Sequence, residues 1–325
     1  MPRVSVCMAA YNHERYIGSA IQSVLDQTYK DWELIITDDA STDHTPEVIS
    51  RFTDPRIKFF RSETNQGIAA TTAKCAREAQ GEYIAILNSD DLFLPSKLEK
   101  QVQLLNERPE VAAVFSHTWF INRWGKDYNK LNIGFYANSR NIFNKANRSR
   151  WEWLNYFFYH GNTLCDPSVM ARREVYTEIA PPDPRFPIAG DYNRWVRVCL
   201  RHEIFIIPEV LLHFRIHGKN ASGNWLGPRP RISWELLLIL RNYLELTEPD
   251  ELRRVFPELF RDLDPDPELI PYYLALAALK ARSHTHRLFA VEVLSTLLGD
   301  RDKARRLQEK HGFGYRDFWR LCKLI

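Results

Sequence analysis

Short apolar runs alternate with helical patterns over the first 120 residues, and no other feature restricts the fold as strongly. The runs that predict buried strands are residues 4–10, 32–37, 57–61, 83–88 and 111–117. Between them, apolar spacing at i, i+3 and i+4 and helix-start signals predict helices at 13–28, 41–52, 68–79 and 95–107. We therefore predict right-handed βαβ units that build a mostly parallel sheet with helices on both faces.

The rest of the chain divides into a mixed part and a helical part. The elements predicted next are a helix at 151–160, a helix at 191–201 and two short strands within 204–217. A segment rich in Gly, Pro and Asn follows at 220–231, and beyond it only helical patterns occur. The prediction is an α/β domain over residues 1–223 and an all-helical region over residues 224–325.

Composition excludes several classes of protein. The charged fraction of 26% with a net charge of +3 gives no argument for nucleic-acid binding. Five cysteines without a C-x-x-C pair predict reduced thiols rather than a zinc site. The longest aliphatic run, Leu236–Leu240, is far too short for a membrane span, and no signal-like segment opens the chain. We expect a cytoplasmic protein that can still lie on a membrane surface.

Polar residues follow three of the predicted strands where those strands end. The first strand runs into Tyr11 and Asn12, the second into Asp38 and Asp39, and the fourth into residues 88–91, Asn-Ser-Asp-Asp. Ligands of an open α/β sheet bind at these strand ends, but no G-x-G-x-x-G motif follows the first strand. Carboxylates reach a diphosphate through a divalent cation, which also removes the repulsion between adjacent acids. The pattern predicts a Mg²⁺ or Mn²⁺ site for a nucleotide.

Four segments in this order resemble the family-2 glycosyltransferases of the GT-A fold. They begin with the opening block "VSVCMAAYN…DDASTD" and the block "NQGIAATTAKCAREAQGEYIAILNSDD". The later two are "AGDYNRWVR" and "FRIHGKNAS". The resemblance covers roughly residues 3–223. It implies a GT-A, Rossmann-like sheet flanked by helices, followed here by a C-terminal all-helical extension.

The resemblance also implies roles for particular residues. Asp39 matches the aspartate that holds the nucleobase, and Asp191 matches the general base that deprotonates the acceptor hydroxyl. Asp91 matches the metal ligand, Asp90 matches its partner near the ribose or the water shell of the metal, and His217 matches a residue near the metal and diphosphate. Further donor-binding positions implied by the matching blocks are Ala10, Tyr11, Asn12, Asn65, Asn88 and Ser89.

Two positions depart from the family pattern. Asn88 stands where the first aspartate of the D-x-D motif is expected, so the metal has one anionic ligand fewer, or Asp90 and Asp91 suffice. Thr72 stands where an arginine is expected, so Lys74 or Arg77 must replace the cationic donor contact or the contact is absent.

The implied activity is a metal-dependent, inverting glycosyltransferase reaction in surface polysaccharide or glycoconjugate synthesis. The implied donor is a UDP-, GDP- or dTDP-linked sugar, the cofactor is Mn²⁺ or Mg²⁺, and the acceptor is a glycan or a lipid-linked sugar. Two alternatives stay open. A sugar nucleotidyltransferase would need a Gly-rich basic loop after the first strand, and a non-catalytic nucleotide-sugar or glycan-binding relative would tolerate the changes at Asn88 and Thr72.

Several of these residues also have structural interpretations. Asp38, Asp39, the pair Asp90–Asp91 and Asp191 precede predicted helices and can act as helix N-terminal charges. His217 can be an ordinary half-buried histidine. The aromatic residues within 151–159 can form a core instead of a sugar-stacking platform.

The C-terminal helices show an uneven charge distribution. Residues 248–268 are acidic, whereas residues 280–325 are basic and end in aromatic and basic residues, namely Phe313, Tyr315, Arg316, Phe318, Trp319, Arg320 and Lys323. Such a mixture suits an anionic membrane surface, which would place the protein at the inner face of the plasma membrane. The alternative is a helical subdomain that packs on the catalytic core or mediates homo-oligomerisation.

Overall fold

The computed structural model describes residues 1–128, 141–218, 220, 229–260, 264–281 and 283–323, with backbone alone for 229–231. These residues form two compact units. The first unit combines Met1–Ser149 with Asn162–Leu226, and the second combines Arg150–Gly161 with Gly227–Ile325. The assignment of residues 1–223 to catalysis and 224–325 to a helical region stays a prediction, and the structure adds helix 150–160 to the second unit.

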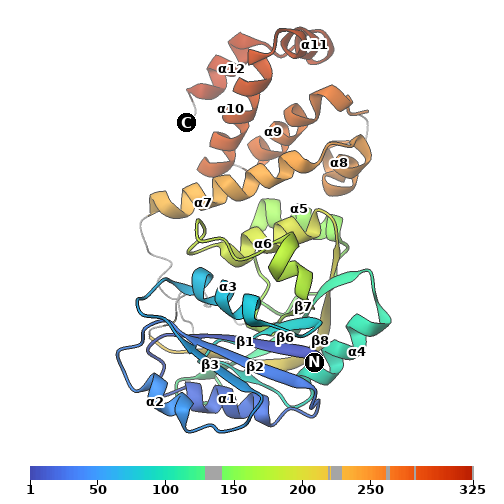
Figure 1. The fold of residues 1–325 in the computed structure, drawn as a ribbon. Helices are drawn as coiled ribbons and strands as arrows, with labels where there is room; N and C mark the ends of the chain where they lie inside the picture. The colour runs from blue at the N-terminus through green and yellow to red at the C-terminus, as the bar shows by residue number, and fades with distance from the viewer. Residues whose placement is uncertain (129–140, 219, 221–228, 261–263, 282, 324–325) are drawn as a thin grey trace. The chain divides into compact units, whose positions relative to one another are not determined.

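The first unit is built on one eight-stranded sheet with the strand order β3-β2-β1-β4-β7-β6-β8-β5 (Figure 1). Its strands are β1 (Val4–Ala10), β2 (Trp32–Asp38), β3 (Ile57–Arg61), β4 (Tyr83–Ile86), β5 (Leu92–Phe93), β6 (Val111–Asn122), β7 (Met170–Arg172) and β8 (Glu203–Ile216). The neighbours β3, β2, β1 and β4 are all parallel, as are β6 and β8. The predicted, mostly parallel α/β sheet is therefore confirmed, and β7 and β5 are its antiparallel members.

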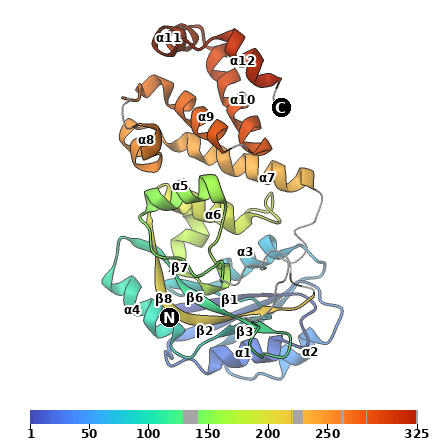
Figure 2. The same ribbon diagram turned by 180° about the vertical axis from the view of Figure 1, so that it is seen from behind.

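Helices cover both faces of this sheet. The helices of the first unit are α1 (Ile17–Leu25), α2 (Thr45–Ser50), α3 (Ile68–Glu78), α4 (Lys97–Glu107) and α6 (Gly190–Cys199). Both views place α3 on the opposite side of the sheet from α1 and α2 (Figures 1 and 2). All seven residues of β2 are buried, as expected for a parallel strand covered on both faces.

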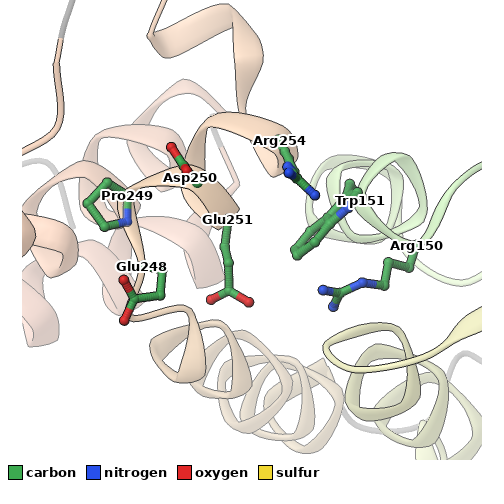
Figure 3. Close-up of a pocket in the computed structure, with 7 residues that line it drawn as sticks. All are labelled: Arg150, Trp151, Glu248, Pro249, Asp250, Glu251 and Arg254. Atoms are coloured by element: carbon green, nitrogen blue, oxygen red, sulfur yellow. The ribbon is translucent and has the colours of Figure 1, made fainter.

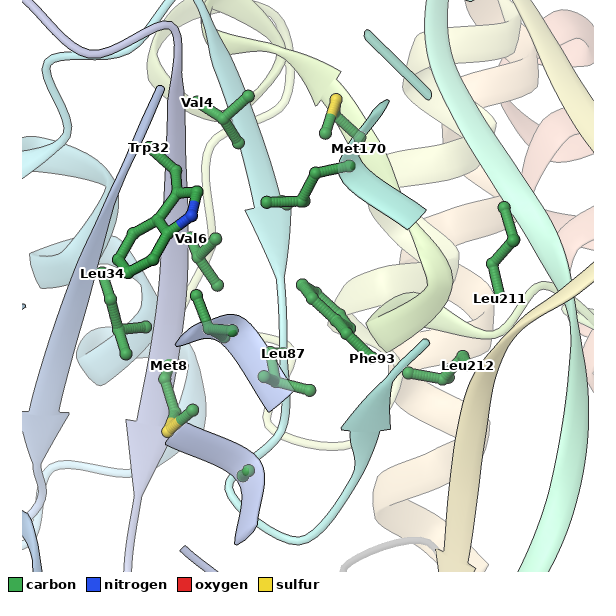
Figure 4. Close-up of a cluster of buried hydrophobic side chains, with 14 of the residues drawn as sticks. Val4, Val6, Met8, Trp32, Leu34, Leu87, Phe93, Met170, Leu211 and Leu212 are labelled. Atoms are coloured by element: carbon green, nitrogen blue, oxygen red, sulfur yellow. The ribbon is translucent and has the colours of Figure 1, made fainter. Parts of the chain in front are cut away.

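One apolar cluster joins side chains of the parallel strands to side chains of the later strands of the sheet (Figure 4). Its members include Val4, Val6, Met8, Trp32, Leu34, Leu87, Phe93, Met170, Leu211 and Leu212. Residues from β1 and β2 thus share one core with residues from β7 and β8. Leu87, directly after β4, belongs to this shared core, and the Asn-Ser-Asp-Asp segment follows it.

The region 204–217 forms one long strand, so the prediction of two short strands was wrong. β8 pairs with β6 along its length, but the register shifts between Ser116 and His117. Ile207 pairs with Ser116 and Val210 pairs with His117, which leaves Pro208 and Glu209 without pairing residues in β6. Proline has no N–H to donate to the ladder, so the chain bulges there and then resumes pairing. The short strands β5 and β7 were not predicted at all.

The second unit is helical, which confirms the helical extension predicted from the sequence. Its helices are α5 (Arg150–His160), α7 (Arg229–Arg241), α8 (Pro249–Val255), α9 (Ile270–Lys280), α10 (His284–Gly299), α11 (Arg301–His311) and α12 (Tyr315–Cys322). Trp153, Phe157 and Phe158 of α5 are buried, so this part of the aromatic segment forms core. None of the described helices is long and apolar enough to cross a membrane.

A pocket of about 470 Å³ opens within the second unit between α5 and α8 (Figure 3). The guanidinium of Arg150 lies 3.4 Å from the ring centre of Trp151, and that of Arg254 lies 5.5 Å from it. The opposite wall is formed by Glu248, Pro249, Asp250 and Glu251. The lining therefore combines one indole ring with charges of both signs.

Candidate active site

Two loops meet at the carboxyl ends of β1 and β2. Ala10 pairs with Asp38 in the sheet, and the Asp39 amide donates to the Ala10 carbonyl at 2.8 Å. Asn12 adopts a left-handed backbone with φ of 53°, and its side-chain oxygen accepts the Thr42 amide at 2.8 Å. These bonds hold the predicted donor residues Ala10 and Asn12 against the loop that bears Asp39. Tyr11 stands beside them and is 44% exposed.

The two adjacent acids after β2 have different environments. Asp38 is fully buried, accepts the Ser41 amide at 3.0 Å and lies 3.4 Å from the Arg61 guanidinium, so its role is structural. The Asp39 carboxylate accepts the amides of Gln66 and Gly67 at 2.9 and 2.8 Å. Asp39 thereby fixes the loop that starts α3, where the predicted donor residue Asn65 is exposed. Its role with the nucleobase stays a prediction.

The segment after β4 brings three potential metal ligands together. The Asp90 carboxylate lies 2.9 Å from Nε2 of His217, and one ligand atom from each of His13, Asp90 and His217 lies within 4.8 Å of the others. The Ser89 hydroxyl hydrogen-bonds Nδ1 of His13 at 2.7 Å. His13 was not predicted, although its place just after the first strand is the signal that points to it.

Asp91 is not a member of this group. It is fully buried, and its two oxygens accept the Arg215 amide at 2.7 Å and the Asn88 side-chain amide at 3.1 Å. Burial first, and then the charge of Asp90, raise the pKa of Asp91 well above its ordinary value. The prediction grouped Asp91 with His217, whereas the structure groups Asp90 with His217. Asn88 bonds Asp91, which gives this departure from the D-x-D pattern a structural role.

Arg215 fixes the Asp90–Asp91 turn from β8. Its Nε donates to the Asp90 carbonyl at 2.6 Å, and its Nη1 donates to the Asn122 carbonyl at 3.2 Å. Its guanidinium also lies 5.2 Å from the ring centre of Tyr16. Arg215 is only 4% exposed, and from this buried position it contacts the turn after β4, the turn after β6 and Tyr16.

The donor set of His13, Asp90 and His217 fits a divalent cation. Burial lowers the pKa of His13, which favours the neutral imidazole that metal binding requires, although the Asp90 charge opposes this shift. One carboxylate and two imidazoles suit Mn²⁺ better than Mg²⁺, which prefers oxygen ligands and water. The structure therefore supports a cation site, with Asp90 supplying its negative charge.

Asp191 lies in the first turn of α6, whose N-cap is Ala189. Its carboxylate accepts the Tyr192 amide at 2.7 Å and the Asn162 side-chain amide at 2.9 Å. Burial first, and then the charge of Asp166, raise the pKa of Asp191 to about 7. A carboxylate with this pKa can accept a proton near neutral pH, which an ordinary helix cap is not tuned to do.

The buried thiol of Cys165 interacts electrostatically with both Asp191 and the segment after β4. Burial first, and then the charges of Asp91, Asp166 and Asp191, raise the pKa of Cys165 well above its ordinary value. Cys165 therefore lies within electrostatic reach of both Asp91 and Asp191. The candidate base and the candidate cation site both belong to the first unit.

The sequence model of the family described as Glycosyl transferase family 2 matches residues 5–173, just over half of the 325-residue chain. The chain belongs to glycosyl transferase family 2. Over 224 residues it is 30% identical to an uncharacterized glycosyltransferase, MJ1057, of Methanocaldococcus jannaschii. The aligned stretch covers 67% of this chain and 72% of that protein. Family membership makes the protein a glycosyltransferase and argues against the sugar nucleotidyltransferase alternative.

A second relative is similar over a shorter stretch. The UDP-Glc:α-D-GlcNAc-diphosphoundecaprenol β-1,3-glucosyltransferase WfgD of Escherichia coli is 41% identical over 102 residues. That match covers 31% of this chain and 40% of WfgD, so it spans well under half of the relative.

Solved structures share the fold along nearly the whole chain. S. aureus TarS 1–349 in complex with UDP-GlcNAc aligns with a TM-score of 0.63 and 17% identity over 97% of this chain and 93% of that chain. The mannosyltransferase PcManGT of Pyrobaculum calidifontis, in complex with GDP-Man and Mn²⁺, aligns with a TM-score of 0.52 and 18% identity over 99% of this chain and 85% of that chain. These likenesses confirm the predicted GT-A fold of the glycosyltransferase.

Proposed function

We propose that the protein is a metal-dependent, inverting glycosyltransferase. It transfers a sugar from a nucleoside-diphosphate donor to an acceptor hydroxyl in the synthesis of a surface polysaccharide or glycoconjugate. One observation supports this proposal above the others. His13, Asp90 and His217 converge just after β1, β4 and β8, and the same unit holds Asp191, a carboxylate whose pKa is about 7.

The donor occupies the edge formed by the ends of β1, β2 and β4. Its proposed contacts are Ala10, Tyr11, Asn12, Asp39, Asn65, Asn88, Ser89 and Asp90. A UDP-, GDP- or dTDP-linked sugar is the expected donor class, and the related structures TarS and PcManGT hold UDP-GlcNAc and GDP-Man. Asp39 shapes this edge because it fixes the Gln66–Gly67 loop.

We propose that Asp90, His217 and His13 hold the cation, Mn²⁺ in preference to Mg²⁺. Such a cation, when bound, neutralises the diphosphate leaving group as a Lewis acid. We propose that Asp91 positions Asp90 through Arg215. The Asp91 carboxylate accepts the Arg215 amide, and the Arg215 side chain donates to the Asp90 carbonyl. This assignment replaces the predicted ligand pair of Asp91 and His217.

Asp191 is the proposed general base. Asn162 donates to one of its oxygens, and burial raises its pKa to about 7. Asp191 removes the proton from an acceptor hydroxyl as that oxygen attacks the anomeric carbon from the face opposite the leaving diphosphate. This attack inverts the configuration at that carbon and needs no covalent enzyme intermediate.

The acceptor is proposed to be a glycan or a lipid-linked sugar. The name of the relative WfgD includes a diphosphoundecaprenol-linked acceptor, which motivates the lipid-linked class. With such an acceptor, the protein would work in the cytoplasm at the inner face of the plasma membrane. The exposed aromatic residues Tyr315 and Trp319 of α12 are available for membrane contact or for a homo-oligomer.

Hydrolysis of nucleotide sugars tests this proposal. Candidate UDP-, GDP- and dTDP-sugars are incubated with the protein and Mn²⁺, and release of nucleoside diphosphate is measured. We expect metal-dependent release from one donor class, abolished by Asp90→Asn and by chelator. Release that persists unchanged in Asp90→Asn would contradict the proposal. Tight, metal-dependent nucleotide binding without turnover, even with acceptor extracts, would favour a non-catalytic binder.

A further inference from the structure

A second pocket of about 330 Å³ opens in the first unit, and two arginines and two aromatic residues line it. They are Arg15, Tyr16, Arg123 and Trp124. No carboxylate is among these lining residues, and neither Arg15 nor Arg123 forms an ion pair or a hydrogen bond with any described side chain. Both arginines and Trp124 are exposed. The pocket therefore presents two unneutralised guanidinium groups to solvent.

The walls of this pocket are held in place by the backbone. Arg123 and Trp124 lie on a tight turn after β6, where the Asn122 side chain accepts the amides of Trp124 and Lys126 at 2.9 and 3.0 Å. Gly125 takes the left-handed φ of 78° that this turn requires. The guanidinium of Arg123 lies 4.0 Å from the ring centre of Trp124, so the two side chains form one preorganised surface.

Tyr16 connects the pocket to the candidate active site. The Tyr16 ring stacks on His217 with 4.7 Å between ring centres and 25° between planes. Arg215 contacts both regions, because it donates to the Asp90 carbonyl and to the Asn122 carbonyl at the base of the turn. The pocket is therefore separated from the Asp90–His217 pair by one aromatic ring.

We propose that Arg15 and Arg123 form a phosphate-binding subsite beside the candidate cation site. Guanidinium groups bind phosphate oxygens through paired, charge-assisted hydrogen bonds, and two of them lining one pocket match a phosphate or a diphosphate. Tyr16 and Trp124 supply apolar surface for the group attached to that phosphate. The inference rests on the proposed function for its biological meaning, since the phosphate belongs either to the donor or to a phosphorylated acceptor.

Binding measurements separate these two sources. Geranyl diphosphate, titrated by calorimetry in the presence of EDTA, serves as the acceptor-like probe, with geraniol as the uncharged control. UDP and GDP, titrated with Mn²⁺, report the donor. The variants are Arg15→Gln, Arg123→Gln and, as a matched control, Arg173→Gln, which removes an exposed arginine outside the pocket.

We expect Arg15→Gln and Arg123→Gln each to weaken the diphosphate probe by about 10- to 100-fold, the usual effect of losing hydrogen bonds to a charged group. Arg173→Gln should bind like the unaltered protein. If the two variants instead weaken UDP or GDP, the subsite stands and its phosphate comes from the donor. The inference is overturned if neither probe loses affinity in either variant, or if geraniol binds as well as its diphosphate.

The Asp90→Asn variant keeps this test independent of the proposed function. It should lose Mn²⁺-dependent nucleotide binding and keep metal-free binding of geranyl diphosphate. A protein that binds the diphosphate through Arg15 and Arg123 but shows no Mn²⁺ dependence in any assay would contradict the proposed cation site and leave the subsite intact.

Discussion

Nε2 of His217 lies 2.9 Å from the Asp90 carboxylate, although 127 positions separate the two residues along the chain. Asn220 donates to the same carboxylate oxygen at 3.3 Å, so the loop after β8 closes over the turn after β4. A buried carboxylate with the ring nitrogens of two histidines close by is placed to bind a cation. This relationship makes Asp90 and Asp91 experimentally separable.

Asp90→Asn and Asp91→Ala should fail in different ways. Asp90→Asn keeps the shape and removes the charge, so Mn²⁺-dependent nucleotide binding should disappear while thermal stability changes little. Asp91→Ala leaves the buried Arg215 amide without its acceptor, which should lower the free energy of unfolding by about 1–3 kcal/mol. Calorimetric titration and thermal denaturation measure the two effects. Loss of metal dependence in Asp91→Ala alone would restore the ligand role that the sequence predicted.

His13 should contribute directly to metal affinity. We expect His13→Gln to weaken Mn²⁺ binding by at least about 10-fold, because a neutral imidazole is lost from the donor set. His44→Gln is the matched control, since His44 is exposed on the next loop and lies outside the three-residue group. Mn²⁺ titration followed by electron paramagnetic resonance measures the free ion. Equal affinities in the two variants would remove His13 from the site.

The fold was largely predictable because each strand and helix of the first 120 residues bears its own local pattern. Asp39 and Asp90 were noticed because each follows a strand, whereas the roles of both, and of Asp191 and His217, came from the resemblance to the family. The orientation of the Asp90–Asp91 turn was not predictable. It is set by Arg215, which lies 124 positions after Asp91, and no local pattern encodes that contact.

The membership of His13 in the candidate cation site was also not predictable from local sequence. Its position after the first strand was visible in the sequence, but its proximity to His217 depends on how two distant loops pack. The long strand β8 was missed for a related reason. Pro208 ends a local strand pattern, whereas pairing with β6 continues beyond the bulge because many other residues supply ladder hydrogen bonds.

The rate of sugar transfer should depend on the ionisation of Asp191. Because its pKa is about 7 and its basic form is the active one, activity should rise with pH and level off above about pH 7. Asp191→Asn should bind nucleotide normally and lower the transfer rate by about 10²- to 10⁴-fold without this pH dependence. Initial rates between pH 5.5 and 8.5 provide the measurement. A rate in Asp191→Asn near that of the unaltered protein would reduce Asp191 to a structural role.

The carboxyl group of Asp191 should also make the stability of the fold fall as the pH rises, whereas the activity rises. Its pKa in the folded state, about 7, lies above the ordinary value of 3.8, so folding favours the protonated form. This contribution is complete below about pH 3.8 and is lost as the pH rises through about 7. The melting temperature of the unaltered protein should therefore fall relative to that of Asp191→Asn between pH 5 and 8. Parallel melting curves would refute the raised pKa.

Asn162 should tune the base. Its side-chain amide donates to Asp191 at 2.9 Å, which favours the charged carboxylate. Asn162→Ala removes this donor, so the pKa of Asp191 should rise and the midpoint of the pH–rate profile should move to higher pH. Above that midpoint most of the activity should return, because the carboxylate itself is intact. An unchanged midpoint with a uniformly lower rate would assign Asn162 to acceptor binding instead.

The C-terminal helix α12 should bind anionic membranes if it docks the protein beside a lipid-linked acceptor. Tyr315 and Trp319 are 54% and 61% exposed, and α12 has no buried residue, so its aromatic side chains are available for a membrane. The preceding helix α11 has a structural task, because Arg306 and Lys310 each lie 2.6 Å from the carboxylate of Asp266. A truncation after Gly312 therefore removes α12 and keeps these contacts.

Co-sedimentation with phosphatidylglycerol vesicles tests this docking. We expect binding at low salt that weakens at high salt, because each cation near the headgroups contributes about 1 kcal/mol. Truncation after Gly312 or the double change Arg316→Gln and Arg320→Gln should abolish it, whereas Arg305→Gln on α11 should not. Absence of binding by the intact chain would rule out docking on anionic lipid. The exposed aromatic side chains of α12 would then point to self-association, which sedimentation velocity measures directly as a change in mass when α12 is removed.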